Sequence, residues 1–184
     1  RSKQMKAPLI LLITCLGSLT QAEVTSEKQG SVLRFSAAGQ PICDYQMQPG
    51  EVPEGVDPVF KHGAHLHPIY SPSGKLVTGN HPEDHRWHRG VWFAHGAVNG
   101  HDLWRELPEK KTGHIVLDAI LETRDGSGGV LRLRHRWEAH DAKILLTDET
   151  VIRIQRTAAG TILDYEVTLR ATHGAVTLGD TEEG

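Results

Sequence analysis

Cysteines and basic residues are both scarce in this sequence, and each shortage excludes a class of protein. The 184 residues include two Cys, and 20 Lys and Arg against 23 Asp and Glu, which gives a net charge of −3 at pH 7. A mildly acidic chain without runs of Lys or Arg lacks the electrostatic footprint of nucleic-acid binding, so we exclude nucleic acid as a partner. One of the two Cys, Cys15, lies in a predicted signal peptide, so no internal disulfide is expected to stabilise the fold.

Four catalytic signatures are also absent from the sequence. It contains no P-loop, no G-x-G-x-x-G, no G-x-S-x-G and no Cys-x-x-Cys motif. Nucleotide-dependent, α/β-hydrolase and thiol chemistry therefore have no support from motifs.

The N-terminus has the three parts of a secretory signal peptide. Lys3 and Lys6 form a basic region, residues 9–16 an apolar region and residues 20–22 a small-residue cleavage site. The apolar run is about half of the roughly 20 residues that span a bilayer. We therefore predict an exported protein, periplasmic or extracellular, with no transmembrane anchor after cleavage. The predicted organisation is a signal peptide (1–22), a polar leader (23–30) and one β-sandwich domain (31–184).

Apolar and polar residues alternate with a period of two through much of the second half of the chain. This pattern is typical of strands with one buried face, and the connections between them are short and turn-like. We expect an antiparallel β-sandwich. Because the sequence stops at residue 184, just after a predicted strand, we also expect further chain to complete the sandwich. Asp148 is an exception, because it lies on an otherwise apolar face. The strands are predicted over residues 115–122, 131–137, 144–155 and 163–171.

Residues 48–111 lack this alternation and hold eight of the twelve His, from His62 to His101. Histidine titrates near neutral pH and is the commonest transition-metal ligand, so the cluster indicates a functional site. His65 and His67 would share one face of a strand. A predicted helix over residues 82–89 would present His85 and His88 on one face.

Two kinds of chemistry fit this segment. His95, on a predicted strand with Val91 and Phe93, would join His85 and His88 as ligands of copper, zinc or iron, a possible divalent transition metal. Alternatively, Trp and Arg side chains among the histidines would bind a sugar, by stacking and by fork-like hydrogen bonds. The candidate catalytic residues are His85, His88, His95 and Glu183, and the candidate substrate-binding residues are His67, Trp87, Arg89, Asn99, Asp102, Trp104 and Asp180.

The runs His67-Pro68, residues 84–96 (DHRWHRGVWFAHG) and residues 179–184 (GDTEEG) resemble a family of exported bacterial proteins. It is labelled PmoA family or methane oxygenase PmoA and is also catalogued as a domain of unknown function, DUF6807. The resemblance covers about residues 31–184, although the family often has Pro and His where this chain has Arg86 and Trp87. The methane monooxygenase subunit of that name spans the membrane several times, which this chain does not, so we do not adopt its activity.

A fold-level likeness to the galactose-mutarotase-like supersandwich implies a sugar site that uses His as acid and Glu or Asp as base. Our leading hypothesis is an exported protein that binds or acts on a small molecule or glycan. A His-ligated, metal-dependent oxidoreductase or hydrolase is the second, and a non-catalytic binding module, with the histidines supporting loops, is the third. The sequence does not predict the oligomeric state.

Overall fold

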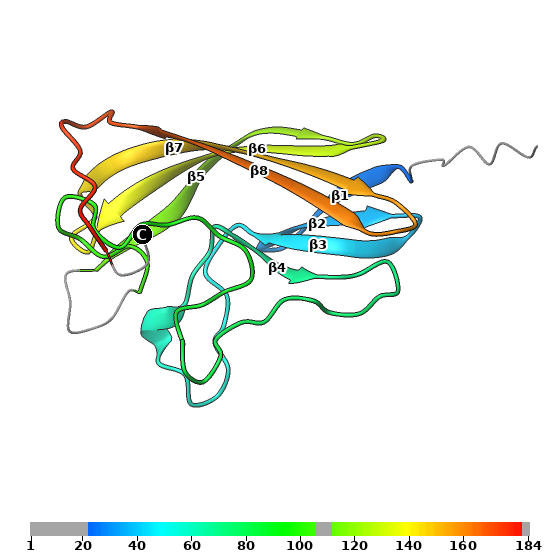
Figure 1. The fold of residues 1–184 in the computed structure, drawn as a ribbon, viewed down its shortest axis with the longest axis horizontal. Coiled ribbons are helices and arrows are strands. Elements are labelled where there is room, and N and C mark those ends of the chain that lie inside the picture. The colour runs from blue at the N-terminus through cyan, green and yellow to red at the C-terminus, as the bar shows by residue number, and fades with distance from the viewer. Residues whose placement is uncertain (1–21, 106–111, 182–184) are drawn as a thin grey trace, which may run out of the picture.

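Two antiparallel four-stranded sheets pack face to face in the computed structural model, which describes residues 22–105 and 112–181 (Figure 1). The smaller sheet has the strand order β1-β2-β3-β4 and the larger one β5-β6-β7-β8. A 3₁₀ turn, Pro58–Phe60, is the only helical element in the described part of the chain. The predicted all-β sandwich is therefore confirmed.

The smaller sheet consists of β1 (Val24–Gln29), β2 (Val32–Ala37), β3 (Gln40–Gln46) and β4 (His65–Ile69). Strand β1 lies inside the polar stretch 23–30, which the sequence analysis set apart as a leader, so that stretch is part of the sheet. Only Val24 of β1 is fully buried, because β1 is an edge strand with most of its side chains in solvent. Backbone pairing with β2 holds a polar edge strand as well as an apolar one, which explains why composition missed it.

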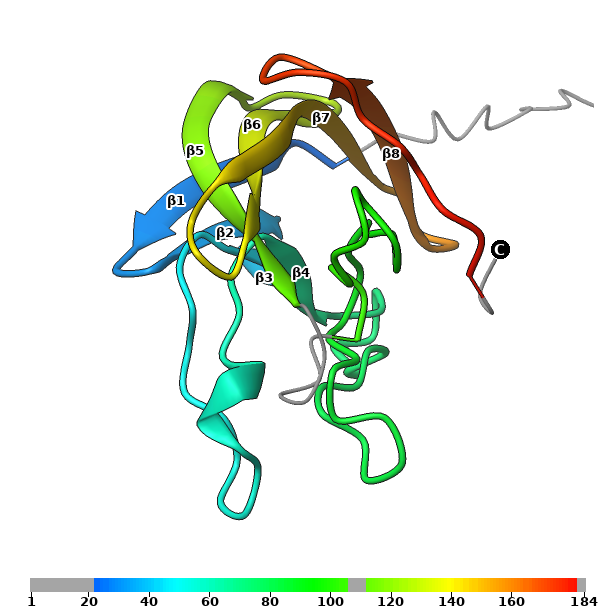
Figure 2. The ribbon, with the colours of Figure 1, turned by 90° about the vertical axis from the view of Figure 1, so that its left-hand side faces the viewer.

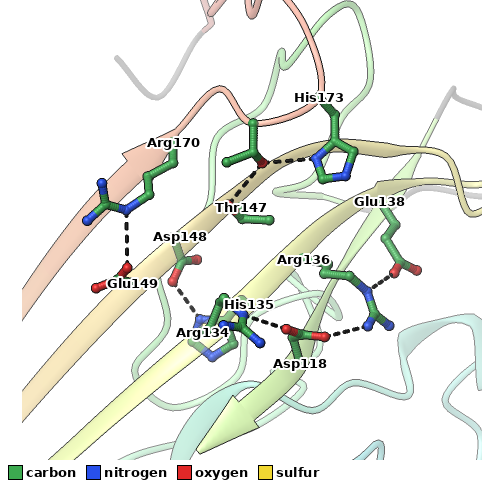
Figure 3. Close-up of polar contacts among 11 residues, drawn as sticks. Asp118, Arg134, His135, Arg136, Glu138, Thr147, Asp148, Glu149, Arg170 and His173 are labelled. Carbon is green, nitrogen blue, oxygen red and sulfur yellow. Dashed lines mark hydrogen bonds and ion pairs between the residues drawn. The ribbon is translucent and has the colours of Figure 1, made fainter. Parts of the chain in front are cut away.

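The larger sheet consists of β5 (Gly113–Arg124), β6 (Gly129–Ala139), β7 (Ile144–Arg156) and β8 (Thr161–Arg170). These strands confirm all four that the alternation predicts, with small shifts at the ends. Charged side chains on the outer face form ion pairs across the strands, as between Asp118 and both Arg134 and Arg136 (Figure 3). The opposite face of each strand is therefore left to the core.

The core lies between the sheets. Phe35, Tyr45 and Leu66 from the smaller sheet pack with Leu131 and Ile152 from the larger one, and all five are fully buried. A second cluster, around Trp137 and Leu103, closes the end of the sandwich where the long β4–β5 connection returns to β5. Cys43 belongs to the first cluster, and burial raises the pKa of its thiol to about 12.

Asp148 is buried because a hydrogen-bond network surrounds it. Its carboxylate accepts hydrogen bonds from Trp137 Nε1 at 2.7 Å and Thr150 Oγ1 at 2.9 Å, and it lies 2.8 Å from Nδ1 of His135 (Figure 3). The other nitrogen of His135, Nε2, lies 2.6 Å from the Tyr45 hydroxyl. We call these five residues the core network. It accounts for an acidic residue on an apolar face, since burial of a carboxylate is tolerated when its oxygens are paired.

The β4–β5 connection contains neither the helix predicted over residues 82–89 nor the strand predicted over 91–95. Two successive turns replace the helix. The amide of His85 donates to the Pro82 carbonyl at 3.2 Å, and the amide of His88 donates to the His85 carbonyl at 2.9 Å. The capping residues and Pro of this stretch fit turns as well as a helix start, and no apolar stripe is present to hold a helix against the sheet. The turns form the tip of a hairpin, residues 80–89, which a bridge between Asn80 and Arg89 closes.

Most of the irregular chain extends from one side of the sandwich. Figures 1 and 2 show the 47–64 segment and much of the β4–β5 connection beyond the smaller sheet, on the side away from the larger one, whereas Val98 and Leu103 near the end of that connection pack against the larger sheet. Within the described residues, no helix is long and apolar enough to cross a bilayer. The predicted signal peptide lies outside the described residues except for Ala22, which forms an isolated bridge with Arg156.

Candidate functional site

A polar cleft of about 260 Å³ lies where β3 and β4 meet the 80–89 hairpin and the 47–64 segment. We call it the histidine cleft. Four imidazoles and one guanidinium line it, together with two amides and a carboxylate at its rim. The lining residues are Gln46, Gly50, Glu51, His62, His65, His67, Asn80, His81 and Arg89.

Strand β4 contributes His65 and His67, which lie two residues apart and so share one face, as predicted. Leu66 between them is fully buried in the core. Val91 joins the hairpin to this strand through two backbone hydrogen bonds with Leu66, of 2.9 and 3.0 Å. Gly90 permits this approach, because a Cβ there would lie 2.0 Å from the Leu66 carbonyl oxygen. The close contact holds Arg89 over the cleft.

His65 has one ring nitrogen engaged and one without a partner. Its side chain is 4% exposed, and Nδ1 donates a hydrogen bond to the Gly63 carbonyl at 3.1 Å. Burial lowers its pKa to about 3, so the ring is neutral at physiological pH. A neutral imidazole that donates from Nδ1 has a lone pair on Nε2, and that buried atom has no hydrogen-bond partner among residues 22–105 and 112–181.

The neighbouring groups add hydrogen-bonding capacity to the cleft. His81 Nδ1 donates to the Arg86 carbonyl at 2.7 Å, which leaves Nε2 as an acceptor in the neutral ring. His67 Nδ1 lies 2.9 Å from the Thr78 hydroxyl, and partial burial lowers its pKa. The side-chain oxygen of Asn80 is buried and has no hydrogen-bond partner among the described residues.

One buried cation and one exposed ion pair determine the charge of the cleft. Arg89 is 2% exposed, and its guanidinium lies over the Trp92 ring, 5.4 Å from the centroid. Such a contact is favourable for a guanidinium held away from water. At the rim, Glu51 forms a 2.5 Å ion pair with Lys61, so its carboxylate is directed outward.

An aromatic cluster, which we call the aromatic shelf, lies beside the cleft. Trp92 and Trp104 stack with their centroids 4.8 Å apart and their planes at 29°. His88 contacts both indoles, at 5.4 and 6.0 Å, and is joined by Trp87 at 5.8 Å and His85 at 4.8 Å. The predicted proximity of His85 and His88 is thus present, although a turn and not a helix produces it.

Asp102 fixes one end of the shelf. Its Oδ1 accepts hydrogen bonds from the amides of Trp104 and Arg105, both at 2.9 Å, and its side chain is buried. The carboxylate therefore orients Trp104 through the backbone and does not line the cleft, although Asp102 was among the candidate substrate-binding residues.

The remaining predicted site residues lie against the chain's C-terminal segment. His95 Nε2 lies 3.0 Å from the Gly179 carbonyl, and Asn99 Oδ1 accepts a hydrogen bond from the Thr177 amide at 2.8 Å. Asp180 is exposed on the same segment, and Glu183 lies outside the described residues. His95, Asn99 and Asp180 do not line the histidine cleft.

The donor geometry does not support the predicted metal site. Among residues 22–105 and 112–181, no three His, Cys, Asp or Glu side chains lie in a group that could hold a metal ion. His85 and His88 belong to the shelf, whereas the Nε2 atom of His95 contacts a backbone carbonyl. The three histidines proposed as ligands are thus not brought together.

The model of a family of unknown function, DUF6807, matches residues 33–184, more than four fifths of the chain. The chain belongs to the DUF6807 family. No curated protein and no solved structure matches it. The DUF6807 match begins in β2 and includes every residue that lines the cleft and the shelf. The description of the family gives no activity, so the function must be argued from the site.

Sequence analysis selected some of the residues of this candidate site. It singled out His67 and Arg89 and noted that His65 and His67 share a face, but it did not name His62, Gln46 or Asn80 as site residues. The alternation His65-Leu66-His67 was the available signal. On a strand, two histidines that flank a core leucine both point to the face opposite the leucine. The other lining residues come from loops, whose paths carry no periodic pattern.

Proposed function

We propose that the histidine cleft binds an uncharged, hydroxyl-rich ligand, a sugar unit of a small molecule or glycan. The single observation that carries this proposal is the unpaired Nε2 lone pair of buried His65. Buried polar atoms are nearly always paired in folded proteins, so an unpaired acceptor in a cleft favours a ligand that donates to it. The side-chain oxygen of Asn80, also buried and unpaired, adds a second acceptor.

Hydrogen-bond complementarity distinguishes a sugar from an anion. The oxygens of sulfate and of ionised carboxylates only accept, so they would place lone pairs against the lone pairs of His65 and Asn80. A sugar hydroxyl donates to one acceptor and accepts from a nearby donor, such as the Gln46 amide or the Arg89 guanidinium at the same cleft. A polar cleft with mixed donors and acceptors therefore suits several hydroxyls on one ring.

Two sequence-based predictions agree with this proposal without testing it. The predicted export would give the protein access to extracellular glycans. The likeness to the galactose-mutarotase-like supersandwich would make a sugar the expected ligand. Acid or base roles for His88, His95 and Glu183 stay predictions, and our proposal concerns binding.

Calorimetric titration of the full chain with a panel of neutral monosaccharides tests the proposal. We expect one or more to bind, and we expect His65→Leu to weaken binding about tenfold, the equivalent of one lost hydrogen bond of about 1.4 kcal/mol. His140→Leu is the matched control, because His140 is exposed in the β6–β7 turn, and it should bind like the wild type. Absence of binding across the panel, or equal affinity of His65→Leu and wild type, would contradict the proposal.

A further inference from the structure

We infer that the aromatic shelf is a second subsite, contiguous with the histidine cleft, and that the ligand is an oligosaccharide whose neighbouring ring stacks on it. This inference rests on the proposed function, because it extends the same site from one sugar unit to at least two. Three observations support it: the continuity of the two surfaces, the unpaired indole groups, and the size of the cleft.

The 80–89 hairpin joins the two surfaces. Its base supplies Asn80, His81 and Arg89 to the cleft, and its tip supplies Trp87 and neighbouring histidines to the shelf. The amide of His81 donates to the His88 carbonyl at 2.8 Å, which keeps base and tip in one rigid unit. Arg89 belongs to both surfaces, since it lines the cleft and lies over Trp92.

Two indole N–H groups of the shelf have no acceptor within the part of the chain that the structure describes. Nε1 of Trp87 and Nε1 of Trp92 are buried and unpaired, whereas Nε1 of Trp137 in the core donates to Asp148 at 2.7 Å. A buried indole usually finds an acceptor, so two orphaned donors beside an open cleft favour a ligand with acceptor oxygens. Ring and hydroxyl oxygens of a sugar supply them, and its apolar C–H face suits an indole face.

The size of the cleft limits it to a small part of such a ligand. Its volume of about 260 Å³ lies below the 300–1,000 Å³ range of pockets that enclose a drug-sized molecule. One ring therefore fills it, and a longer saccharide must continue outside. The shelf is prepared for that contact, because the Trp92–Trp104 stack and the Asp102 turn fix its rings before any ligand arrives.

The experiment compares a monosaccharide that binds with linear oligosaccharides of the same sugar, using the full chain. We expect the di- or trisaccharide to bind about tenfold more tightly, which is the value of one aromatic contact. Trp104→Ala should remove that gain and leave the monosaccharide affinity unchanged. Trp104→Phe, which retains an aromatic face and guards against misfolding, should keep most of the gain. His65→Leu should weaken mono- and oligosaccharide alike.

The outcomes separate the two proposals. If mono- and oligosaccharides bind equally, or if Trp104→Ala retains the gain, the second subsite is wrong and the cleft proposal stands. If no saccharide of any length binds, the proposed function fails and the inference fails with it. The near-ultraviolet circular dichroism of the stacked Trp92–Trp104 pair supplies an independent readout. Oligosaccharide should alter this signal, and an unchanged signal on saturation would also overturn the inference.

Discussion

The core network and the histidine cleft both contain a buried histidine, yet they differ in how completely their polar atoms are paired. In the core network, both nitrogens of His135 are engaged, by Asp148 and by Tyr45. In the cleft, His65 is equally buried, but only its Nδ1 is engaged. Burial alone therefore does not separate a structural histidine from a functional one. The pairing of the second nitrogen does, because folding rewards complete pairing and a binding site must leave groups for its ligand.

The two regions should also respond to pH at opposite ends of the scale. In the core, burial raises the pKa values of Cys43 and Tyr45, so their neutral forms are favoured in the folded protein. In the cleft, burial lowers the pKa values of His65 and His67, and the neutral form is again favoured. At high pH the unfolded chain releases the protons of Cys43 and Tyr45 more readily than the folded protein, and at low pH it protonates His65 and His67 more readily, so stability falls in both directions. Alkaline instability therefore belongs to the core and acid instability to the cleft.

Asp148→Ala should have the largest effect on stability. It leaves the ring of His135, the indole of Trp137 and the hydroxyl of Thr150 without their buried acceptor, at a cost of about 3–5 kcal/mol. Urea unfolding measures it. Glu149→Ala is the matched control one residue along β7, because Glu149 pairs with Arg170 on the outer face (Figure 3) and such exposed pairs contribute about 0–1 kcal/mol. Equal losses in the two variants would show that the core network does not stabilise the fold.

Acidification should destabilise the protein through His65. In the unfolded chain His65 binds a proton as the pH falls below its ordinary pKa of 6.5. In the folded protein it binds a proton only as the pH approaches its lowered pKa of about 3. The unfolded state therefore gains protons over this window, and stability is fully present above pH 6.5 and lost as the pH falls towards 3. We expect a loss on the order of 3 kcal/mol between pH 6.5 and 4, most of it above pH 5, where ordinary carboxylates are still largely ionised.

The measurement is the free energy of unfolding in urea at half-unit steps of pH. His65→Leu should flatten most of the slope, since it removes the titrating group. His140→Leu, whose histidine is exposed, should keep the wild-type slope. A slope that persists in His65→Leu would assign the acid instability to another group.

The same contrast explains how much of the molecule the sequence predicted. Alternation found β5 to β8, because a strand with one buried face records its burial directly in a period of two. It missed β1, whose edge position needs no apolar face. It also left Asp148 unexplained, because two partners of that carboxylate, His135 and Trp137, come from the neighbouring strand β6. Pairing between strands is not visible in a local pattern.

The site was predicted less completely, for a related reason. The histidine-rich segment does contribute residues to the cleft, among them His67 and Arg89. The helix expected over residues 82–89 was wrong, because Asn80, Pro82 and Gly90 satisfy a hairpin turn as readily as a helix start. His95 was grouped with His85 and His88 on the strength of a strand that the structure does not contain. Which histidines meet depends on how loops fold back, and no periodic pattern specifies that.

The smallest expected change in stability, and the sharpest test of the comparison, comes from one substitution made in both regions. At pH 7.5, His65→Leu should change the free energy of unfolding by less than about 1 kcal/mol, because only the Gly63 carbonyl loses a partner and an unpaired acceptor is removed. His135→Leu should cost about 3 kcal/mol, since it removes the buried partner of the Tyr45 hydroxyl and one of the three hydrogen-bond partners of the Asp148 carboxylate. The two histidines are similarly buried, so loss of transferable surface cannot produce the difference. If His65→Leu proves as costly as His135→Leu, the second nitrogen of His65 has a partner within the chain, and the cleft loses the acceptor on which ligand binding was argued.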